Sequence, residues 1–439
     1  MINNLTFSGG VHVDENKQYS EDAPLEMQVL PKVVHIPLLQ GSGVKCDPLV
    51  KKGDVVKKGQ LIGSSEASFS SSVHSSISGV VKEIKVRYSA EGKKVECVTI
   101  EREDDNDEAV EFLSRQSSGK VDSETLVEVA KEAGIIGMGG AGFPFNVKLN
   151  GAIDNGIDSI IANGAECEPY LTTDHRLMLD FPTEVTKGVA LVVDALNADA
   201  GYIAIEDNKK NAIEKIDATV SEQEKLTVAS LKTKYPQGDS TRIVDAVLNR
   251  KIPVGERSGS VNAFVSNVGT FKALHDAYYF GKPLYERIIS VTGPGVVTPK
   301  NILTRIGTPV IDLIEQCGGF QGDVVAVIAG GPMSGKQIYD VEVPVTKAIT
   351  GIVVLTREKM DFRKSTPCIK CDRCVKVCPS KLNPSKLYAA VEREKFDFAK
   401  EHYIEECIQC GACSYVCPAK LQLAETMKLG INEIWTRGQ

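Results

Sequence analysis

Eight cysteines near the carboxyl end of the chain form two copies of one spaced pattern. The first copy reads CIKCDRCVKVCP from Cys368 to Pro379, and the second reads CIQCGACSYVCP from Cys407 to Pro418. Both follow C-x2-C-x2-C-x3-C-P, a spacing at which three thiolates converge on one iron–sulfur cubane. The fourth thiolate, just before the proline, points to the neighbouring cubane. The spacing therefore predicts two [4Fe–4S] clusters.

The expected ligand sets are crossed between the two copies. One cluster takes Cys368, Cys371, Cys374 and Cys417, and the other takes Cys407, Cys410, Cys413 and Cys378. The alternative is a pair of zinc sites, because zinc also accepts four thiolates. Zinc ribbons rarely duplicate this spacing with a proline after each copy, so the cluster interpretation is favoured.

The segment between the two copies predicts how they are joined. It reads PSKLYAAVEREKFDFAKEHY and places Leu387, Val391, Phe396 and Phe398 among helix formers. Apolar residues at helical spacing with few turn residues indicate helices, so we expect a helical ferredoxin domain. Clusters of this kind carry one electron at a time, and a different site must handle any substrate.

A glycine-rich loop, IIGMGGAGFPFNVKL at 135–149, is the candidate for that second site. Gly137, Gly139, Gly140 and Gly142 let backbone N–H groups approach a phosphate or a flat ring without interference from a Cβ atom. Lys148 adds a positive charge that suits a phosphate. The spacing differs from G-x-G-x-x-G, so the loop alone leaves both ligand binding and an ordinary tight turn open.

The elements around these motifs predict a multidomain α/β protein. Short β runs with turns fill about 30–100, and helical and strand-like runs alternate over about 120–275, as in βαβ units around a mostly parallel sheet. A mixed segment at about 285–355 is typical of a small β-grasp-like module. The charged run EREDDNDE at 101–108 is expected to be a solvated linker. The predicted domains are 1–110, 118–280, 285–355 and 362–430.

The first domain resembles the lipoyl/biotinyl-like fold, a compact β-sandwich built from paired hairpins. The segments VKKGDVVKKGQLIG and VHSSISGVVKEI are similar to its two halves. Carrier versions of the fold attach their cofactor to a lysine at an exposed hairpin tip. The corresponding linker here, SSEASFSSS, has no lysine, so a docking or scaffolding role is favoured over a carrier role.

Four motif groups resemble one family of flavoproteins. GMGGAGFP resembles the G-R-G-G-A-G-F-P loop of the flavin-binding subunit of respiratory complex I and related hydrogenases and formate dehydrogenases. NGAECEPY at 163–170, YPQGD at 235–239 and VSNVGTF at 265–271 are similar to further flavin-site elements of that family. With the hairpin domain in front and the cysteine motifs behind, nearly the whole chain resembles the C subunit of the Rnf electron-transport complexes.

The resemblance implies a non-covalent FMN on the glycine loop and an NAD(H) site beside it. The residues it assigns to FMN are Gly137, Gly139, Gly140, Lys148, Asn163, Glu166, Tyr235, Gly238, Asp239, Asn267 and Thr270. Those it assigns to NAD(H) are Phe143 and Glu168. The chain departs from the family where Met138 replaces an arginine, Phe145–Asn146 replaces Thr-Gly and Ser240 replaces an acid, which bears most on the nucleotide contacts.

Other interpretations of single residues remain open. Glu166 and Glu168 are alternatively acids that cap a helix starting near Pro169. Cys167 is expected to be a small buried residue and not a nucleophile, because no histidine lies within its motif. The six histidines are isolated in sequence and are given no role.

Bulk composition limits the classes of partner. The 439 residues carry a formal net charge of −7, which argues against binding to a nucleic-acid backbone. The amino terminus lacks a basic region followed by an apolar run, and no apolar stretch reaches the roughly 18–20 residues of a spanning helix. We therefore expect a cytoplasmic chain that is held at a membrane, if at all, through partners.

The expected function is electron transfer between NAD(H), FMN and two [4Fe–4S] clusters. The family resemblance implies membrane-integral and iron–sulfur partner subunits of one complex, with ferredoxin as an indirect partner, and ion pumping carried out by those partners. Two alternatives remain: a cobalamin reductase of similar domain order, and an electron-relay adaptor that has lost NAD binding.

Overall fold

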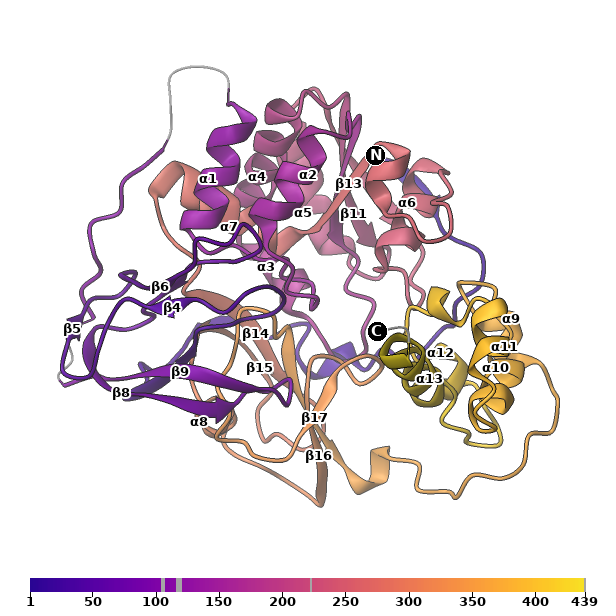
Figure 1. The fold of residues 1–439 in the computed structure, drawn as a ribbon. Helices are drawn as coiled ribbons and strands as arrows, with labels where there is room; N and C mark the ends of the chain where they lie inside the picture. The colour runs from indigo at the N-terminus through magenta and orange to yellow at the C-terminus, as the bar shows by residue number, and fades with distance from the viewer. Residues whose placement is uncertain (104–106, 116–120, 222, 438–439) are drawn as a thin grey trace.

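Two small antiparallel sheets make the first domain of the chain. The computed structural model describes residues 1–103, 107–115, 121–221 and 223–437 (Figure 1). One sheet has the order β3-β9-β8-β5 and the other the order β4-β6-β7, around a core that includes Ile36, Ile62 and Ile100. The predicted β-sandwich is confirmed. Its strands are β3 (Val33–Pro37), β4 (Asp47–Pro48), β5 (Val55–Val56), β6 (Leu61–Ser64), β7 (Val73–His74), β8 (Gly79–Tyr88) and β9 (Lys94–Glu101).

A five-stranded sheet with all neighbours parallel forms the centre of the second domain. Its order is β1-β12-β11-β10-β13, with β1 (Ile2–Leu5), β10 (Ser159–Gly164), β11 (Ala200–Glu206), β12 (Leu226–Leu231) and β13 (Ala263–Asn267). Successive residues of β10 enter different cores, since Ile160 packs in one and Ile161 in the other. The sheet is therefore buried on both faces, as parallel sheets are.

Helices cover both faces of this sheet. Helix α6 (Ser240–Leu248) contributes Ile243 and Val244 to the smaller core, and the others pack mainly around the larger one. They are α1 (Ser123–Glu132), α2 (Phe145–Ile153), α3 (Thr173–Asp180), α4 (Pro182–Ala195), α5 (Lys210–Val220) and α7 (Val268–Phe280), with a 3-10 turn at Ser258–Val261. The predicted βαβ alternation is confirmed.

The carboxyl ends of the parallel strands lie at one edge of this sheet. Asn163, near the end of β10, is in register with Asn267 at the end of β13. Glu206 at the end of β11 is in register with Leu231 at the end of β12. Ligands of open parallel sheets bind outside this edge, so the topology points to the loops that follow these strands.

A six-stranded mixed sheet forms the third domain, the predicted β-grasp-like module. Its order is β17-β16-β18-β14-β15-β2, and helix α8 (Val310–Gln316) packs into its core through Leu313 and Ile314. The strands are β2 (Leu25–Met27), β14 (Glu286–Thr292), β15 (Lys300–Arg305), β16 (Val324–Ala329), β17 (Lys336–Ile338) and β18 (Gly351–Thr356), followed by a 3-10 turn at Arg357–Lys359.

Helices build the fourth domain, as the spacing between the cysteine motifs predicted. Leu387, Val391 and Phe396 belong to its core together with several of the cysteines. Its elements are α9 (Arg373–Val377), α10 (Pro384–Val391), α11 (Phe396–Glu401), a 3-10 turn at Ile404–Glu406, α12 (Ala412–Tyr415) and α13 (Leu423–Arg437). Among the described residues, every helix is too short or too polar to cross a bilayer.

The amino-terminal segment does not join the domain that follows it in sequence. The predicted first domain begins at residue 1, but β1 extends the sheet of the second domain and β2 extends that of the third. Both strands pair with a strand that would otherwise be an open sheet edge, and hydrogen bonding of such edges is favourable. We call residues 1–31 the N-terminal strap.

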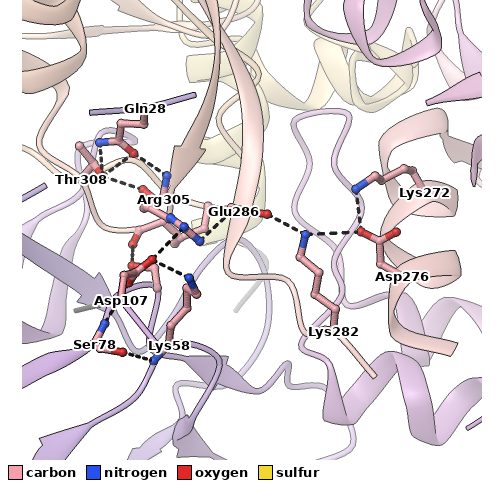
Figure 2. Close-up of polar contacts among 12 residues, drawn as sticks. Gln28, Lys58, Ser78, Asp107, Lys272, Asp276, Lys282, Glu286, Arg305 and Thr308 are labelled. Atoms are coloured by element: carbon pink, nitrogen blue, oxygen red, sulfur yellow. Dashed lines mark hydrogen bonds and ion pairs between the residues drawn. The ribbon is translucent and has the colours of Figure 1, made fainter. Parts of the chain in front are cut away.

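The charged run at 101–108 is not simply a solvated linker. Residues 104–106 lie outside the described part of the chain, but Asp107 accepts from Lys58 Nζ at 2.6 Å and from Arg305 Nη2 at 3.1 Å. Its side chain is only 14% exposed. Figure 2 shows that Arg305 also pairs with Glu286, and that Lys282 links Glu286 to Asp276 of α7. The network joins the first three domains.

Candidate functional site

The glycine loop closes on itself and leaves its tip open. The Gly137 N–H donates to Phe143 O at 2.8 Å, and the Gly142 N–H donates to Gly137 O at 3.2 Å. At the tip, Gly140 has a φ of 108°, and a Cβ there would meet nothing within 4 Å. The N–H groups of 139–141 donate to no residue of the described chain. Successive free N–H groups of this kind form an anion-binding concavity.

A cavity of about 490 Å³ opens beside this tip. All four domains contribute to its wall. The first domain provides Gly41, Ser42 and the turn between β8 and β9, the third provides residues of 329–336 and 348–350, and the fourth provides Ile408 and Cys410. The volume is that of a pocket for a molecule of cofactor size.

Nine of the thirteen residues assigned to FMN or NAD(H) line this cavity. They are Gly139, Gly140, Asn163, Glu166, Glu168, Tyr235, Gly238, Asp239 and Asn267. Their common position follows from the topology, because most of them follow the carboxyl ends of β10, β12 and β13.

The remaining four residues lie behind or beside the wall. Thr270 supports the loop, since its hydroxyl accepts from the Met138 N–H at 2.9 Å. Lys148 donates to Val265 O and lies 5.3 Å from the Phe264 ring, and burial lowers its pKa to about 8. Phe143 packs against Phe69 of the first domain at 5.2 Å between ring centroids. Gly137 closes the loop as described above.

Three cavity residues cap helices that begin at the site. Asn267 accepts from the Gly269 N–H at the start of α7, and Asp239 accepts from two N–H groups at the start of α6. Glu166 accepts from the N–H groups of Asp174 and His175 in α3, at 2.6 and 3.2 Å. Glu166 thus caps α3, although this helix begins at Thr173 and not near Pro169, as the capping alternative expected. The cap of α7 is a neutral amide, so the positive end of that helix dipole is not neutralised by its cap.

Glu168 joins the second domain to the third across the cavity. Its carboxylate accepts from the Met333 N–H at 3.0 Å and from the Ser334 hydroxyl, both in the loop between β16 and β17. Tyr235 Oη lies 3.5 Å from the same carboxylate. Burial raises the pKa of Glu168, although these hydrogen bonds oppose the shift.

Asp174 is a cavity residue that the sequence motifs do not indicate. It is 8% exposed, and its carboxylate accepts from Asn267 Nδ2 at 2.7 Å. Burial, followed by the neighbouring Glu166 carboxylate, raises the pKa of Asp174 to about 7. It lies in TTDHR, just after NGAECEPY, and only its place at the start of α3 brings it back to the cavity.

Cys167 also lines the cavity, where its thiol accepts from the Gly238 N–H at 3.3 Å. Removal from water raises the pKa of this thiol, and the Glu206 carboxylate raises it further. A protonated thiol is a poor nucleophile, as expected for this residue, although Cys167 is only partly buried and not fully buried as expected.

The eight motif cysteines gather in the two crossed groups. Four of them, Cys368, Cys371, Cys374 and Cys417, line one small cavity of the fourth domain. In the other group, burial raises the pKa of Cys413, and Cys407, Cys410 and Cys378 lie close enough to raise it further. No three His, Cys, Asp or Glu side chains in the described ranges are spaced to hold a single metal ion. The groups have the composition that two cubanes require.

Comparison with protein families divides the chain in the same way. Residues 5–105 match the RnfC barrel sandwich hybrid domain, 130–276 the Nuo51 FMN-binding domain, 288–337 the SLBB domain and 360–418 a 4Fe–4S dicluster domain. The fold classes predicted for the four parts are confirmed.

Three curated relatives resemble the chain over most of its length. The C subunit of the proton-translocating ferredoxin:NAD(+) oxidoreductase complex of Clostridium ljungdahlii is 41% identical, over 91% of this chain and 87% of the relative. The C subunit of the Na(+)-translocating complex of Acetobacterium woodii is 37% identical, over 89% and 88%. The C subunit of the ion-translocating oxidoreductase complex of Rhodobacter capsulatus is 35% identical, over 89% and 76%. The chain belongs to the RnfC family.

Membership of the RnfC family agrees with the chemistry of the residues present. The free N–H groups at the glycine loop suit the phosphate of FMN, and the two groups of cysteines suit [4Fe–4S] clusters. This RnfC-family chain is an electron-transfer oxidoreductase subunit with FMN and two [4Fe–4S] clusters as cofactors.

Sequence motifs did not identify the parts of the RnfC cavity wall that come from other domains. Gly41, the turn between β8 and β9, and the loop between β16 and β17 lie far from the flavin motifs in sequence. They reach the cavity only because the domains pack around it. No local signal in the sequence marks them.

Proposed function

We propose that this chain passes electrons between NAD(H), FMN and its two [4Fe–4S] clusters as a subunit of a ferredoxin:NAD(+) oxidoreductase assembly. One observation carries the proposal: a single cavity has the glycine loop in its wall and also Cys410, a cysteine of one cluster group. A flavin bound there lies beside a cluster ligand. The proposal is further supported by the complexes for which the relatives are named.

Residues at the ends of the parallel strands bind and orient the flavin in this proposal. The N–H groups of the glycine loop hold its phosphate, with the amino end of α7 nearby. Asn163 and Asn267 present amides to the cavity, each fixed by a hydrogen bond to Gly238 O or to Asp174. Glu168 marks the side of the cavity assigned to NAD(H), where the third domain closes the wall.

The bound groups supply the redox chemistry: FMN takes up two electrons as a hydride and releases them singly, and each cluster carries one electron. The chain contributes position, exclusion of water and proton balance. Burial raises the pKa of Asp174 to about 7, so this carboxyl group takes up and releases a proton near neutral pH beside the strand ends. The cysteine group that contains Cys410 is next to the cavity, and the group that contains Cys368 is the exit toward a partner.

The assembly that we propose includes membrane-integral and iron–sulfur subunits, which hold this chain at the cytoplasmic face of the membrane. Ferredoxin is an indirect partner, and those subunits translocate the ion. The names of the relatives support this assignment, since each belongs to an ion-translocating complex.

Cofactor analysis and rapid mixing test the proposal on the full chain purified without oxygen. We expect one FMN and about eight iron and eight sulfide per chain, the content of two [4Fe–4S] clusters. NADH is expected to bleach the flavin absorbance within a single turnover, before the clusters are reduced.

Each alternative gives a different result in the same measurements. A flavin that NADH leaves oxidised, with both clusters intact, supports the adaptor without NAD binding. About two zinc atoms and no acid-labile sulfide would overturn the cluster assignment. Rapid reduction of cobalamin by a chain that never co-purifies with membrane subunits supports the cobalamin reductase.

A further inference from the structure

The N-terminal strap runs along the loops that form the cavity wall. After β1, Val11 forms a bridge with Tyr235, and the Tyr170 N–H donates to Glu15 O at 2.8 Å. The strap then continues into β2 at the edge of the third domain. Figure 1 shows it in indigo, passing from the second domain toward the third. The strap is therefore placed to act on the 165–171 loop, which carries Glu166 and Glu168.

One side chain of the strap, Lys17, enters beneath that loop. It is 5% exposed, and its Nζ donates to the carbonyl oxygens of Glu166 at 2.9 Å, Glu168 at 3.1 Å and Leu171 at 2.7 Å. An ammonium group has three N–H donors and no acceptor, whereas a neutral amine has only two donors. Three carbonyl partners therefore fit the charged form of Lys17.

A second buried lysine completes the support. Lys209 Nζ donates to Ala165 O at 2.7 Å, to Asn208 Oδ1 at 2.9 Å and to the Glu206 carboxylate at 3.2 Å. Four carbonyl groups of the 165–171 loop are thus turned toward two lysines. The side chains of Glu166, Cys167 and Glu168 line the cavity on the other side.

The backbone of the loop needs this support. Glu166 has a φ of 49° and Tyr170 a φ of 69°, values in the left-handed region that side chains disfavour. Such conformations persist only where the surroundings impose them. The hydrogen bonds from Lys17 hold the carbonyl group of Glu166 itself and that of Leu171, the residue after Tyr170.

Lys17 Nζ also lies directly behind two residues of the cavity wall, since it binds the carbonyl oxygens of Glu166 and Glu168. Burial and the neighbouring Lys209 lower its pKa, while Glu166 and Glu206 oppose that shift. Glu206 forms an ion pair with Lys209 at 3.2 Å. Within the described residues, Lys17 therefore has no carboxylate in an ion pair with it. A positive charge there favours a ligand as it gains electrons and negative charge.

We propose that Lys17 is a positioning residue of the flavin cavity, which holds the 165–171 loop in its ligand-binding conformation and stabilises the reduced flavin more than the oxidised flavin. The proposal rests on the proposed function, because it requires FMN in this cavity. It assigns the strap to the flavin site and not only to fold stability.

Two substitutions of Lys17 separate its hydrogen bonds from its charge. Lys17→Met removes both, and Lys17→Gln keeps two N–H donors without the charge. We expect FMN affinity, measured by fluorescence titration of the flavin-depleted full chain, to fall at least tenfold in K17M and less in K17Q. We expect the flavin midpoint potential to become more negative in both variants, with the reduced form losing at least threefold more affinity than the oxidised form.

Lys347→Met is the matched control. Lys347 is also a buried lysine that donates to carbonyl groups, those of Ser72 at 2.8 Å and Gly134 at 2.7 Å, but it does not touch the 165–171 loop. K347M is expected to lose stability while keeping the flavin potential.

The outcomes distinguish this proposal from the proposed function. A wild-type chain that binds no FMN contradicts the proposed function. If the wild-type chain binds FMN but K17Q and K347M have the same flavin affinity and the same flavin midpoint potential, the proposed role of Lys17 is wrong. If K17M is recovered unfolded, K17Q decides, because its two remaining donors preserve most of the carbonyl contacts.

Discussion

At the scale of single residues, the site depends on polar groups that are buried with defined partners. Asp174 illustrates this, because its carboxylate is held by Asn267 while Glu166 lies close enough to raise its pKa. Glu166 in turn is occupied by the first N–H groups of α3. Several residues that resemble flavin ligands therefore also hold the helices and loops around the cavity.

The raised pKa of Asp174 predicts a pH dependence of stability. The ordinary pKa is 3.8 and the folded value is about 7, so between these pH values the folded chain holds a proton that the unfolded chain releases. The free energy of unfolding therefore falls as pH rises through this window. Between pH 5 and 8 we expect wild type to lose on the order of 2 kcal/mol more than Asp174→Asn, which does not ionise.

Denaturant unfolding of the full chain, followed by circular dichroism at several pH values, measures this difference. Asp154→Asn is the control, because Asp154 is an exposed residue at the end of α2 and its variant should follow wild type. Parallel curves for wild type and D174N would contradict the prediction.

At the scale of elements, the glycine loop is braced by a loop of the first domain. The Ser42 N–H donates to Gly142 O at 2.9 Å, and neighbouring Gly41 has a φ of 103°. A Cβ on Gly41 would lie 2.3 Å from Gly142 O and 2.8 Å from Gly142 Cα. This contact of backbone with backbone leaves no room for a side chain. The β-sandwich therefore braces the glycine loop through this contact.

Gly41→Ala is therefore expected to weaken FMN binding by displacing Gly142. Gly53→Ala is a matched control, because Gly53 has a similar φ of 94° but nothing within 4 Å of its Cβ position. Both variants lose roughly 1–3 kcal/mol of stability from the left-handed backbone. Only G41A should lose FMN affinity, by about tenfold in fluorescence titration, or about 1.4 kcal/mol. Equal affinities of the two variants would contradict the contact.

At the scale of the whole molecule, the cavity exists because four domains meet around it. The ion-pair network of Figure 2 fixes the first three relative to one another, through Asp107, Arg305 and Glu286. The fourth domain contacts the strap and the second domain, since the Gly10 N–H donates to Val377 O and Arg242 donates to Pro379 O. These contacts bring Cys410 to the cavity wall.

Alanine substitutions of the cysteines test both the crossed ligation and the order of the clusters. Crossing predicts that Cys417→Ala and Cys368→Ala give one electron paramagnetic resonance spectrum, and that Cys378→Ala and Cys407→Ala give another. Each variant should lose about half of its iron, because one of two clusters lacks a ligand. The C378A variant lacks a ligand of the cluster next to the cavity. After NADH is added, the other cluster, the one that contains Cys368, should therefore stay oxidised in C378A. Matching spectra for C368A and C378A would contradict the crossing.

The sequence by itself determined the features that depend on short spacing. The cluster cysteines, the glycine loop and the helical linker near Leu387 all lie within local patterns, whose geometry follows from residues a few positions apart. The alternation of strands and helices predicted a mostly parallel sheet, and the structure places Asn163 and Asn267 in register near the ends of two of its strands. The thirteen cofactor residues were assigned by the family resemblance, and nine of them line the cavity.

Only the tertiary structure decided which distant segments complete the site. Lys148 donates to Val265 O and does not line the cavity. Lys17, Asp174 and Cys410 lie at or behind the cavity wall, although they are far apart in the sequence. These positions depend on how the domains pack and where a buried charge finds its partners. Burial and hydrogen bonding in the folded chain determine such long-range contacts, so a local pattern of residue types cannot predict them.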